Sequence, residues 1–157
     1  LDMEEVDAML IEARQFQNKK GNPTAIEILE NAYRKSRNHI QLNKTLVNMH
    51  LHAGNFRRAA KIAETFSETH PNEFEYIYIA SFAYKRAALF EKALETGERL
   101  KLRFPDMLKN LSNLAEIYFY LKEYKKSLEM IRRALKQDPE NIRALLIKKK
   151  LAALNVK

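Results

Sequence analysis

The sequence predicts an all-α protein built from helical repeats, and two observations carry this prediction. The chain has 157 residues but only 3 Gly and 4 Pro, which is too few for the many turns of an all-β protein. Three of the prolines, Pro71, Pro105 and Pro139, recur every 34 residues. Fixed periods of roughly 20–50 residues are typical of stacked structural repeats, so we align the whole chain at this period.

The alignment produces three further columns, which define four repeats. The first column is small and consists of Ala25, Ala59, Ala93 and Ser127. The second is also small and consists of Ala13, Val47, Ser81 and Ala115. The third is mostly aromatic and consists of Phe16, His50, Tyr84 and Tyr118. Small residues would let two helix backbones approach closely, and the aromatic rings would fill the gap beside that crossing. The four repeats are 6–39, 40–73, 74–107 and 108–141.

Each repeat divides into two helices at a turn. Repeat 1 divides at Lys20–Pro23, after which Thr24 is the expected N-cap, and repeat 2 divides at Ala53–Asn55. Repeats 3 and 4 lack glycine at the equivalent turn. Between the turns, apolar residues recur at helical spacing, as in Leu111–Tyr118. Pro71, Pro105 and Pro139 each mark the end of a second helix, because proline cannot continue a helix. The expected helices, in chain order, are 5–19, 24–36, 40–53, 56–69, 74–87, 90–103, 107–121, 124–136 and 141–154.

This pattern resembles the tetratricopeptide repeat, and repeat 4 carries the best match. The matching residues there are Leu111, Leu114, Ala115, Tyr118, Ser127, Ile131, Ala134 and Pro139. The resemblance covers about 6–141. It implies one domain over 1–157, a right-handed α-solenoid of antiparallel helix pairs in which 142–157 forms a capping helix. The chain departs from the family by having no Trp.

One exchange between repeats suggests compensating volumes. Repeat 4 places a large residue before a small one, Ile131 before Ala134, whereas repeat 3 reverses the order with Gly97 and Leu100. Cores tolerate swaps that conserve total volume better than swaps that do not. We therefore expect the reversal to be compensatory packing.

The chain shows no motif for catalysis or cofactor binding. It has no Cys, no Gly-rich phosphate loop, and no GxSxG or HExxH motif. Of the four histidines, His50 is expected in the core, while His39, His52 and His70 are expected to be exposed. We therefore expect a non-enzymatic protein with no metal, no cofactor and no small-molecule substrate.

The family resemblance implies a concave groove, lined by the first helix of each repeat, that binds peptides. The expected binding positions are Lys44, Asn48, Tyr78, Phe82, Lys85, Lys109 and Phe119. The same register also includes Asp7, Leu10, Arg14, Gln17, Gln41, Leu51, Glu75, Ser112 and Glu116. The three large aromatics are either anchors for a bound chain or packing against neighbouring helices.

One subfamily grips a peptide carboxylate with a Lys/Asn/Asn/Lys/Arg clamp. Lys44, Asn48 and Lys109 fall on three of these five positions, whereas Ile79 and Asn113 replace the other two. The alternative to a working clamp is a solvated polar face.

The positive charge is concentrated in the last third of the chain. Residues 108–157 carry 12 basic and 5 acidic side chains, a net charge of +7 out of +8 for the whole chain. Lys125, Arg132, Arg133 and Lys136 form the expected basic outer face. Such a patch could meet phosphates of nucleic acid or an anionic membrane. Because no base-stacking motif accompanies it, we favour an acidic protein partner.

The function expected from the sequence is a protein-interaction module or scaffold that holds a peptide or partner segment. The alternatives are a small secretion-type chaperone or co-chaperone, an accessory domain of a larger protein, and, less favoured, a basic scaffold on nucleic acid or membrane. A homo-oligomer is also left open. We expect a cytoplasmic chain, since no signal peptide or transmembrane segment is visible; because it begins at Leu1, we also expect a processed form or a fragment.

Overall fold

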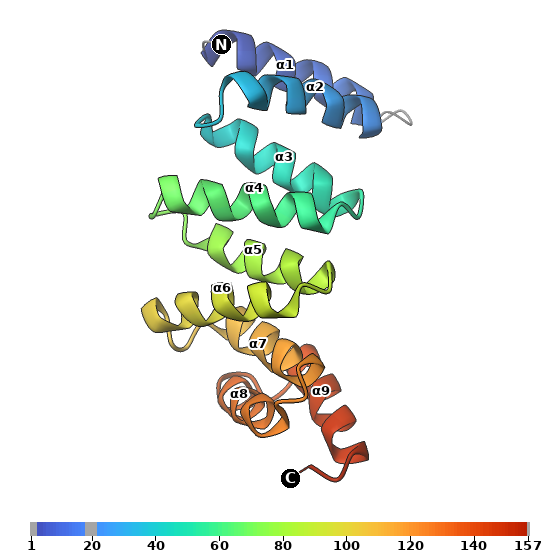
Figure 1. The fold of residues 1–157 in the computed structure, drawn as a ribbon, viewed down its shortest axis with the longest axis vertical. Helices are drawn as coiled ribbons and strands as arrows, with labels where there is room; N and C mark the ends of the chain where they lie inside the picture. Colours follow the sequence, from blue (N-terminus) through green and yellow to red (C-terminus); the bar gives the residue numbers. More distant parts are fainter. Residues whose placement is uncertain (1–2, 18–21, 157) are drawn as a thin grey trace. The chain divides into compact units, whose positions relative to one another are not determined.

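The computed structural model describes residues 3–17 and 22–156, and every regular element in this part of the chain is an α-helix (Figure 1). The helices are α1 (Met3–Gln17), α2 (Asn22–Lys35), α3 (Ile40–His52), α4 (Phe56–Thr69), α5 (Glu75–Arg86), α6 (Phe90–Arg103), α7 (Leu108–Tyr120), α8 (Tyr124–Gln137) and α9 (Ile142–Ala153). Their ends agree with the expected ranges to within about two residues. Positions 18–19, which were expected to belong to the first helix, lie outside the described residues. No described helix has the length and apolar character needed to cross a membrane.

The contacts divide the chain into two compact units, Leu1–Tyr76 and Ile77–Lys157, with the boundary inside α5. In unit 1, α1 packs on α2, α2 on α3 and α3 on α4. In unit 2, α6 packs on α7, α7 on α8, and α9 packs on both α7 and α8. Within each unit the consecutive helices form antiparallel pairs, and those after α2 are joined by short turns (Figure 1). The right-handed solenoid over the whole chain stays a prediction.

The two columns of small residues lie where helices cross, as predicted. All eight of their members are fully buried. The Ser81 hydroxyl on α5 donates to the Ala93 carbonyl oxygen on α6 at 2.8 Å. One repeat later, the Ser127 hydroxyl on α8 donates to the Ala115 carbonyl oxygen on α7 at 2.7 Å. A side chain that reaches the backbone of the neighbouring helix shows directly how close the two helices lie.

The aromatic column is also buried, except that the side chain of its first member, Phe16, lies outside the described residues. Tyr84 and Tyr118 are buried, and so is His50, as predicted. The His50 Nε2 atom lies 2.8 Å from the Glu30 carboxylate, so the core histidine has a polar partner. The prediction that the other histidines are exposed is wrong for His39.

His39 is buried because it caps α3. Its Nδ1 atom accepts a hydrogen bond from the backbone N–H of Leu42 at 3.0 Å, which satisfies one of the free donors at the start of the helix. Of the remaining histidines, His52 is exposed and His70 is half-buried. The prediction that Thr24 is an N-cap is also wrong, because α2 begins at Asn22 and Thr24 lies inside it.

The turns within repeats 2, 3 and 4 share one backbone geometry even where glycine is missing. Gly54 has φ +80°, and Ala88 and Lys122, which follow it at the 34-residue period, have φ 59° and 62°. In each case the residue after the turn bonds back across it, as Leu89 N–H does to the Tyr84 carbonyl oxygen at 2.9 Å. The turn is therefore set by the packing of the helix pair, and glycine only makes it less strained.

Candidate functional site

One face of unit 2 gathers aromatic and charged side chains from α5, α7 and α9. We call it the polar-aromatic face, and its members are Tyr78, Phe82, Lys85, Lys109, Glu116 and Arg143. These helices occupy the first-helix position of successive repeats, so their side chains recur in register along one side of the unit.

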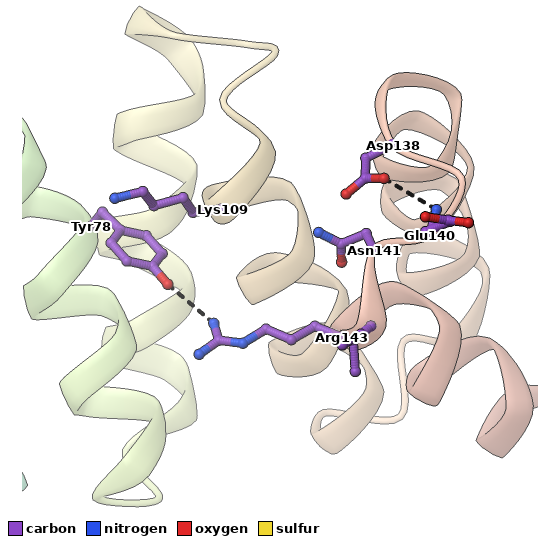
Figure 2. Close-up of a pocket in the computed structure, with 7 residues that line it drawn as sticks. Tyr78, Lys109, Asp138, Glu140, Asn141 and Arg143 are labelled. Carbon is purple, nitrogen blue, oxygen red and sulfur yellow. Dashed lines mark hydrogen bonds between the residues drawn. The ribbon is translucent and has the colours of Figure 1, made fainter.

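Aromatic rings and cations interleave on this face. Tyr78 and Phe82 are one helical turn apart on α5, and their stacked rings have centroids 6.2 Å apart. The Lys109 ammonium lies 5.6 Å from the Tyr78 ring centroid. Arg143 reaches from α9 and donates from Nη1 to the Tyr78 hydroxyl at 3.1 Å (Figure 2), while its guanidinium carbon lies 5.0 Å from the Phe82 ring centroid. The face therefore offers apolar surface and positive charge at the same place.

A buried ion pair lies at the base of the face. The Lys85 ammonium donates to the Glu116 carboxylate at 2.6 Å, and Arg143 Nε lies 3.9 Å from the other Glu116 oxygen. Burial lowers the pKa of Lys85, although the Glu116 carboxylate opposes this shift. The Lys85 side chain is only 4% exposed, so it does not reach the surface of the face. It contributes to the face by holding Glu116, which in turn lies beside Arg143.

An open pocket of about 400 Å³ adjoins the face. It is lined by Tyr78, Lys109, Asp138, Glu140, Asn141, Ile142 and Arg143. Figure 2 shows Tyr78 and Lys109 on one side of the pocket and Asp138 and Glu140 on the other. A pocket with cations on one side and carboxylates on the other suits a ligand that carries both charges, as a peptide segment does.

Asn141 fixes the start of α9 and so positions Arg143. Its side-chain oxygen accepts a hydrogen bond from the backbone N–H of Ala144 at 3.0 Å, which makes it the N-cap of α9. The same oxygen accepts from the Ser112 hydroxyl at 3.0 Å, which ties the cap to α7. Ser112 was expected on the groove surface, but it is buried and serves this helix contact.

The structure thus brings together four of the predicted binding residues of unit 2: Tyr78, Phe82, Lys85 and Lys109. The fifth, Phe119, lies farther along α7 and packs against Tyr120 and Tyr124, with ring centroids 5.8 and 5.7 Å away. The Lys150 ammonium of α9 lies 5.7 Å from the Phe119 ring centroid.

The other two predicted binding residues, Lys44 and Asn48, belong to unit 1. Lys44 forms an ion pair with Glu73 at 3.0 Å and lies 5.8 Å from the Tyr76 ring centroid. Asn48 is exposed, and its carbonyl oxygen lies 2.8 Å from His52 Nδ1. Leu10, expected in the same register, is buried in the core.

The Asn113 position of the clamp pattern lies inside unit 2. Its side-chain amide is fully buried and donates to the Ser81 hydroxyl at 2.9 Å. This position therefore holds α5 and α7 together and does not reach the surface.

The predicted basic outer face divides into two parts. Lys125, Arg132 and Lys136 are exposed on α8. Arg133 instead turns toward the α6–α7 connection, where it donates to the Pro105 carbonyl oxygen and lies 3.5 Å from Asp106. It therefore helps to fix that connection.

The residues that α9 contributes to the polar-aromatic face and to the surface beside it were not predicted from the sequence. Arg143 follows Lys109 by 34 residues, and Leu146 and Lys150 follow Ser112 and Glu116 at the same distance. Leu146 is 55% exposed. Continuing the groove register into the capping helix would have found all three.

Two further observations bear on the class of site. Among residues 3–17 and 22–156, no group of three or more His, Asp or Glu side chains could hold a metal ion. The antiparallel pairs with small residues at each crossing define a helical-repeat protein.

Comparison with known proteins identifies the kind of repeat. Residues 109–141 match the tetratricopeptide repeat family. Among solved structures, YrrB, described as a tetratricopeptide repeat protein with an unusual peptide-binding site, has a TM-score of 0.79 and 20% identity over 94% of this chain and 76% of its own. A tetratricopeptide repeat protein from Parabacteroides merdae ATCC 43184 has a TM-score of 0.75 and 19% identity over 92% of this chain and 58% of its own. MamA from Desulfovibrio magneticus RS-1 has a TM-score of 0.73 and 17% identity over 88% of this chain and 78% of its own.

No curated protein matches the sequence. The fold is nevertheless that of the tetratricopeptide repeat proteins, and the resemblance read from the sequence is confirmed.

Proposed function

We propose that this chain is a non-enzymatic protein-interaction module that binds an extended segment of a partner protein over the polar-aromatic face of unit 2. The observation that carries the proposal is the interleaving of Tyr78 and Phe82 with Lys109 and Arg143. Aromatic residues and arginine are the side chains that most often dominate binding energy at protein interfaces.

The arrangement of Arg143 favours binding because the side chain is already held in place. Its contacts with Tyr78, Phe82 and Glu116 restrict its rotamers before a partner arrives. A preordered side chain loses less conformational entropy on binding. The guanidinium can then donate hydrogen bonds to a carboxylate of the partner.

The surroundings of the face support a peptide as the ligand. The exposed Leu146 and the half-buried Phe119 extend the apolar surface along α9 and α7. We expect an acidic group of the bound segment near Lys109 and Arg143. The similarity in fold to YrrB, whose description includes a peptide-binding site, adds support.

The same geometry favours recognition over catalysis. Glu116 is the carboxylate at the base of the face, and it is held by both Lys85 and Arg143. A general base needs a free lone pair directed at the substrate, whereas this carboxylate neutralises two neighbouring cations. The roles of secretion-type chaperone, co-chaperone and accessory domain stay predictions.

The test is to select peptides from a displayed random library on the full chain and to measure the affinity of the selected peptide for variants. Phe82→Ala and Arg143→Ala should each weaken binding by about tenfold or more. Lys149→Ala is the matched control, since Lys149 is an exposed cation on α9 that does not belong to the face. If both face variants bind as tightly as the original chain, the proposal is wrong. Loss of binding only on Lys44→Ala would place the site on unit 1 instead.

A further inference from the structure

Unit 2 has a second concave surface, an open groove between α8 and α9 with a volume of about 610 Å³. We call it the α8–α9 groove. Its apolar lining consists of Leu128, Ile131, Leu135, Ala152 and Val156. Its charged lining consists of Arg132, Lys136 and Lys148. All three charges are positive, and no carboxylate is among these eight residues.

The repeat register shows why the groove is open. Lys148 follows the fully buried Leu114 by 34 residues, and Ala152 follows the buried Tyr118. On α7, Leu114 packs against Gly97 of α6, and the Tyr118 ring centroid lies 5.8 Å from the Lys126 ammonium of α8, the second helix of the same repeat. In the part of the chain that the structure describes, no helix follows α9, and both Lys148 and Ala152 are exposed. The groove is therefore the position at which a second helix would pack.

The residues at this position specify what kind of helix could occupy it. An entirely apolar helix would bury the Lys148 ammonium without a partner, which costs free energy. An acidic helix with one apolar stripe would instead place its stripe over Leu135 and Ala152 and its carboxylates beside Lys148, Arg132 and Lys136. A groove between two helices also has the shape that an amphipathic helix fits.

We propose that the α8–α9 groove binds an acidic amphipathic helix of a partner protein. The excess positive charge of residues 108–157, net +7, favours the encounter with such a helix. The eight lining residues include no aromatic ring on which a base could stack, so the groove fits nucleic acid less well. This surface is separate from the polar-aromatic face, and the proposal does not depend on it.

The probe is a synthetic, end-capped, fluorescent peptide of about 18 residues, long enough to form helix on binding. Its leucines follow the i, i+3, i+7 spacing, and glutamate and alanine fill the other positions. The full chain should bind it saturably at low salt and more weakly at about 0.5 M NaCl. A scrambled peptide of the same composition should bind about tenfold more weakly or worse, because it has charge without an apolar stripe. The same leucine pattern with lysine in place of glutamate should not bind.

Neighbouring residues of the chain provide matched controls. Lys148→Glu should weaken probe binding by about tenfold or more, whereas Lys149→Glu, the same change one residue outside the groove, should have little effect. Leu135→Asp should likewise weaken binding, and Leu145→Asp, on an exposed leucine of α9 that does not line the groove, should not. Circular dichroism of each variant is the check that it remains helical.

Several results would overturn the proposal. Equal losses for Lys148→Glu and Lys149→Glu would mean that net charge alone attracts the probe. Loss of probe binding on Phe82→Ala but not on Lys148→Glu would assign the probe to the polar-aromatic face. Tighter binding to an oligouridine RNA or to phosphatidylserine vesicles, abolished by Lys148→Glu, would assign the groove to that ligand. Self-association in sedimentation that Lys148→Glu abolishes would assign it to a second copy of this chain.

Discussion

A Cβ atom on Gly97 of α6 would lie 2.8 Å from the Leu114 Cδ2 atom of α7 and 3.0 Å from the Ser81 hydroxyl. Leu114 is fully buried, so little room exists for it to move. The missing side chain at position 97 is thus what lets α6 and α7 approach. Leu100, the next core position of α6, is fully buried, and the compensating-volume hypothesis assigns it the volume that Gly97 lacks.

Gly97→Leu should therefore destabilise the protein by about 2 kcal/mol, since overpacking a core typically costs about 1–3 kcal/mol. The better helix propensity of leucine, about 1 kcal/mol over glycine, offsets only part of this loss. Urea unfolding measures the effect. Glu95→Leu places the same side chain on the exposed side of α6 and should change stability by no more than about 0.5 kcal/mol. Equal stability of Gly97→Leu and the original chain would refute the packing argument.

At the left-handed turn residues Ala88 and Lys122, introducing a glycine should stabilise the protein. A non-glycine residue with φ near +60° is strained by about 1 kcal/mol, so Ala88→Gly should raise stability by up to that amount. Gly54→Ala should lower stability by about 1 kcal/mol for the same reason. Ala87→Gly is the control, because Ala87 precedes the left-handed residue and does not have a positive φ; thermal unfolding should show it to be destabilising. A destabilised Ala88→Gly variant would contradict the strain argument.

Removing only one partner of the Lys85–Glu116 ion pair should destabilise the protein strongly. Glu116→Ala leaves a buried ammonium without its carboxylate and should cost about 3 kcal/mol or more. The double variant Lys85→Met/Glu116→Leu, which removes both charges, should be close to the original chain in stability. Chemical denaturation of both variants and of Lys85→Met alone gives the comparison. A double variant as unstable as Glu116→Ala would show that the pair itself stabilises the fold.

The pH dependence of this pair follows from the direction of the Lys85 shift. Burial lowers the pKa of Lys85 in the folded state below its ordinary value of 10.5. Between the lowered value and 10.5 the unfolded chain binds more protons than the folded chain, so the contribution of Lys85 to stability rises with pH. The rise should be larger in Glu116→Ala, which lacks the carboxylate that opposes the shift.

In unit 1, Glu30 predicts how the stability of the protein changes at acidic pH. Burial raises the pKa of Glu30, but the hydrogen bonds from Arg58 and His50 outweigh it and leave the pKa below the ordinary 4.5. The stabilising contribution is therefore complete above pH 4.5 and is lost as the pH falls through the lower folded value. Glu30→Gln should be less stable than the original chain at pH 7 by about 1 kcal/mol, because the group is partly screened by solvent. The variant should also lose less stability on acidification below 4.5, whereas Glu27→Gln on the exposed side of α2 should behave like the original chain.

The sequence predicted the fold well because period and packing coincide. Each column of small residues marks a helix crossing, and Pro71, Pro105 and Pro139 each follow a second helix, so position along the chain translates directly into position in a repeat. Arg143 was missed only because the register was not continued into the capping helix. The burial of Lys85 and the cap formed by His39 could not be predicted in this way. Lys85 depends on Glu116, which lies 31 positions away along the chain. The His39 cap is local, but histidine is not among the residue types favoured at N-caps.

The side chains of the candidate site were predicted less completely for a related reason. The register places Tyr78 and Phe82 on one side of α5, but it does not say whether they pack or bind. In the structure both rings are half-buried. They stack on one another, and cations from α7 and α9 lie beside them. Phe119 packs on two aromatic neighbours as well. The contacts from Lys109 and Arg143 come from residues about 30 or more positions away along the chain, which local periodicity cannot resolve.

The cap of α9 links stability to recognition and gives the last prediction. Asn141→Ala removes the acceptor for both the Ala144 N–H and the Ser112 hydroxyl, so it should cost about 1 kcal/mol in thermal unfolding. Because α9 then begins less rigidly, Arg143 is held less firmly beside Tyr78, and affinity for a peptide selected on the original chain should fall. Asn141→Asp keeps the acceptor and should restore both properties. Ser112→Ala removes only the contact to α7 and should show the smaller part of each effect. If Asn141→Ala lowers stability but leaves the affinity for the peptide unchanged, Arg143 is positioned by its contacts with Tyr78 and Glu116 alone.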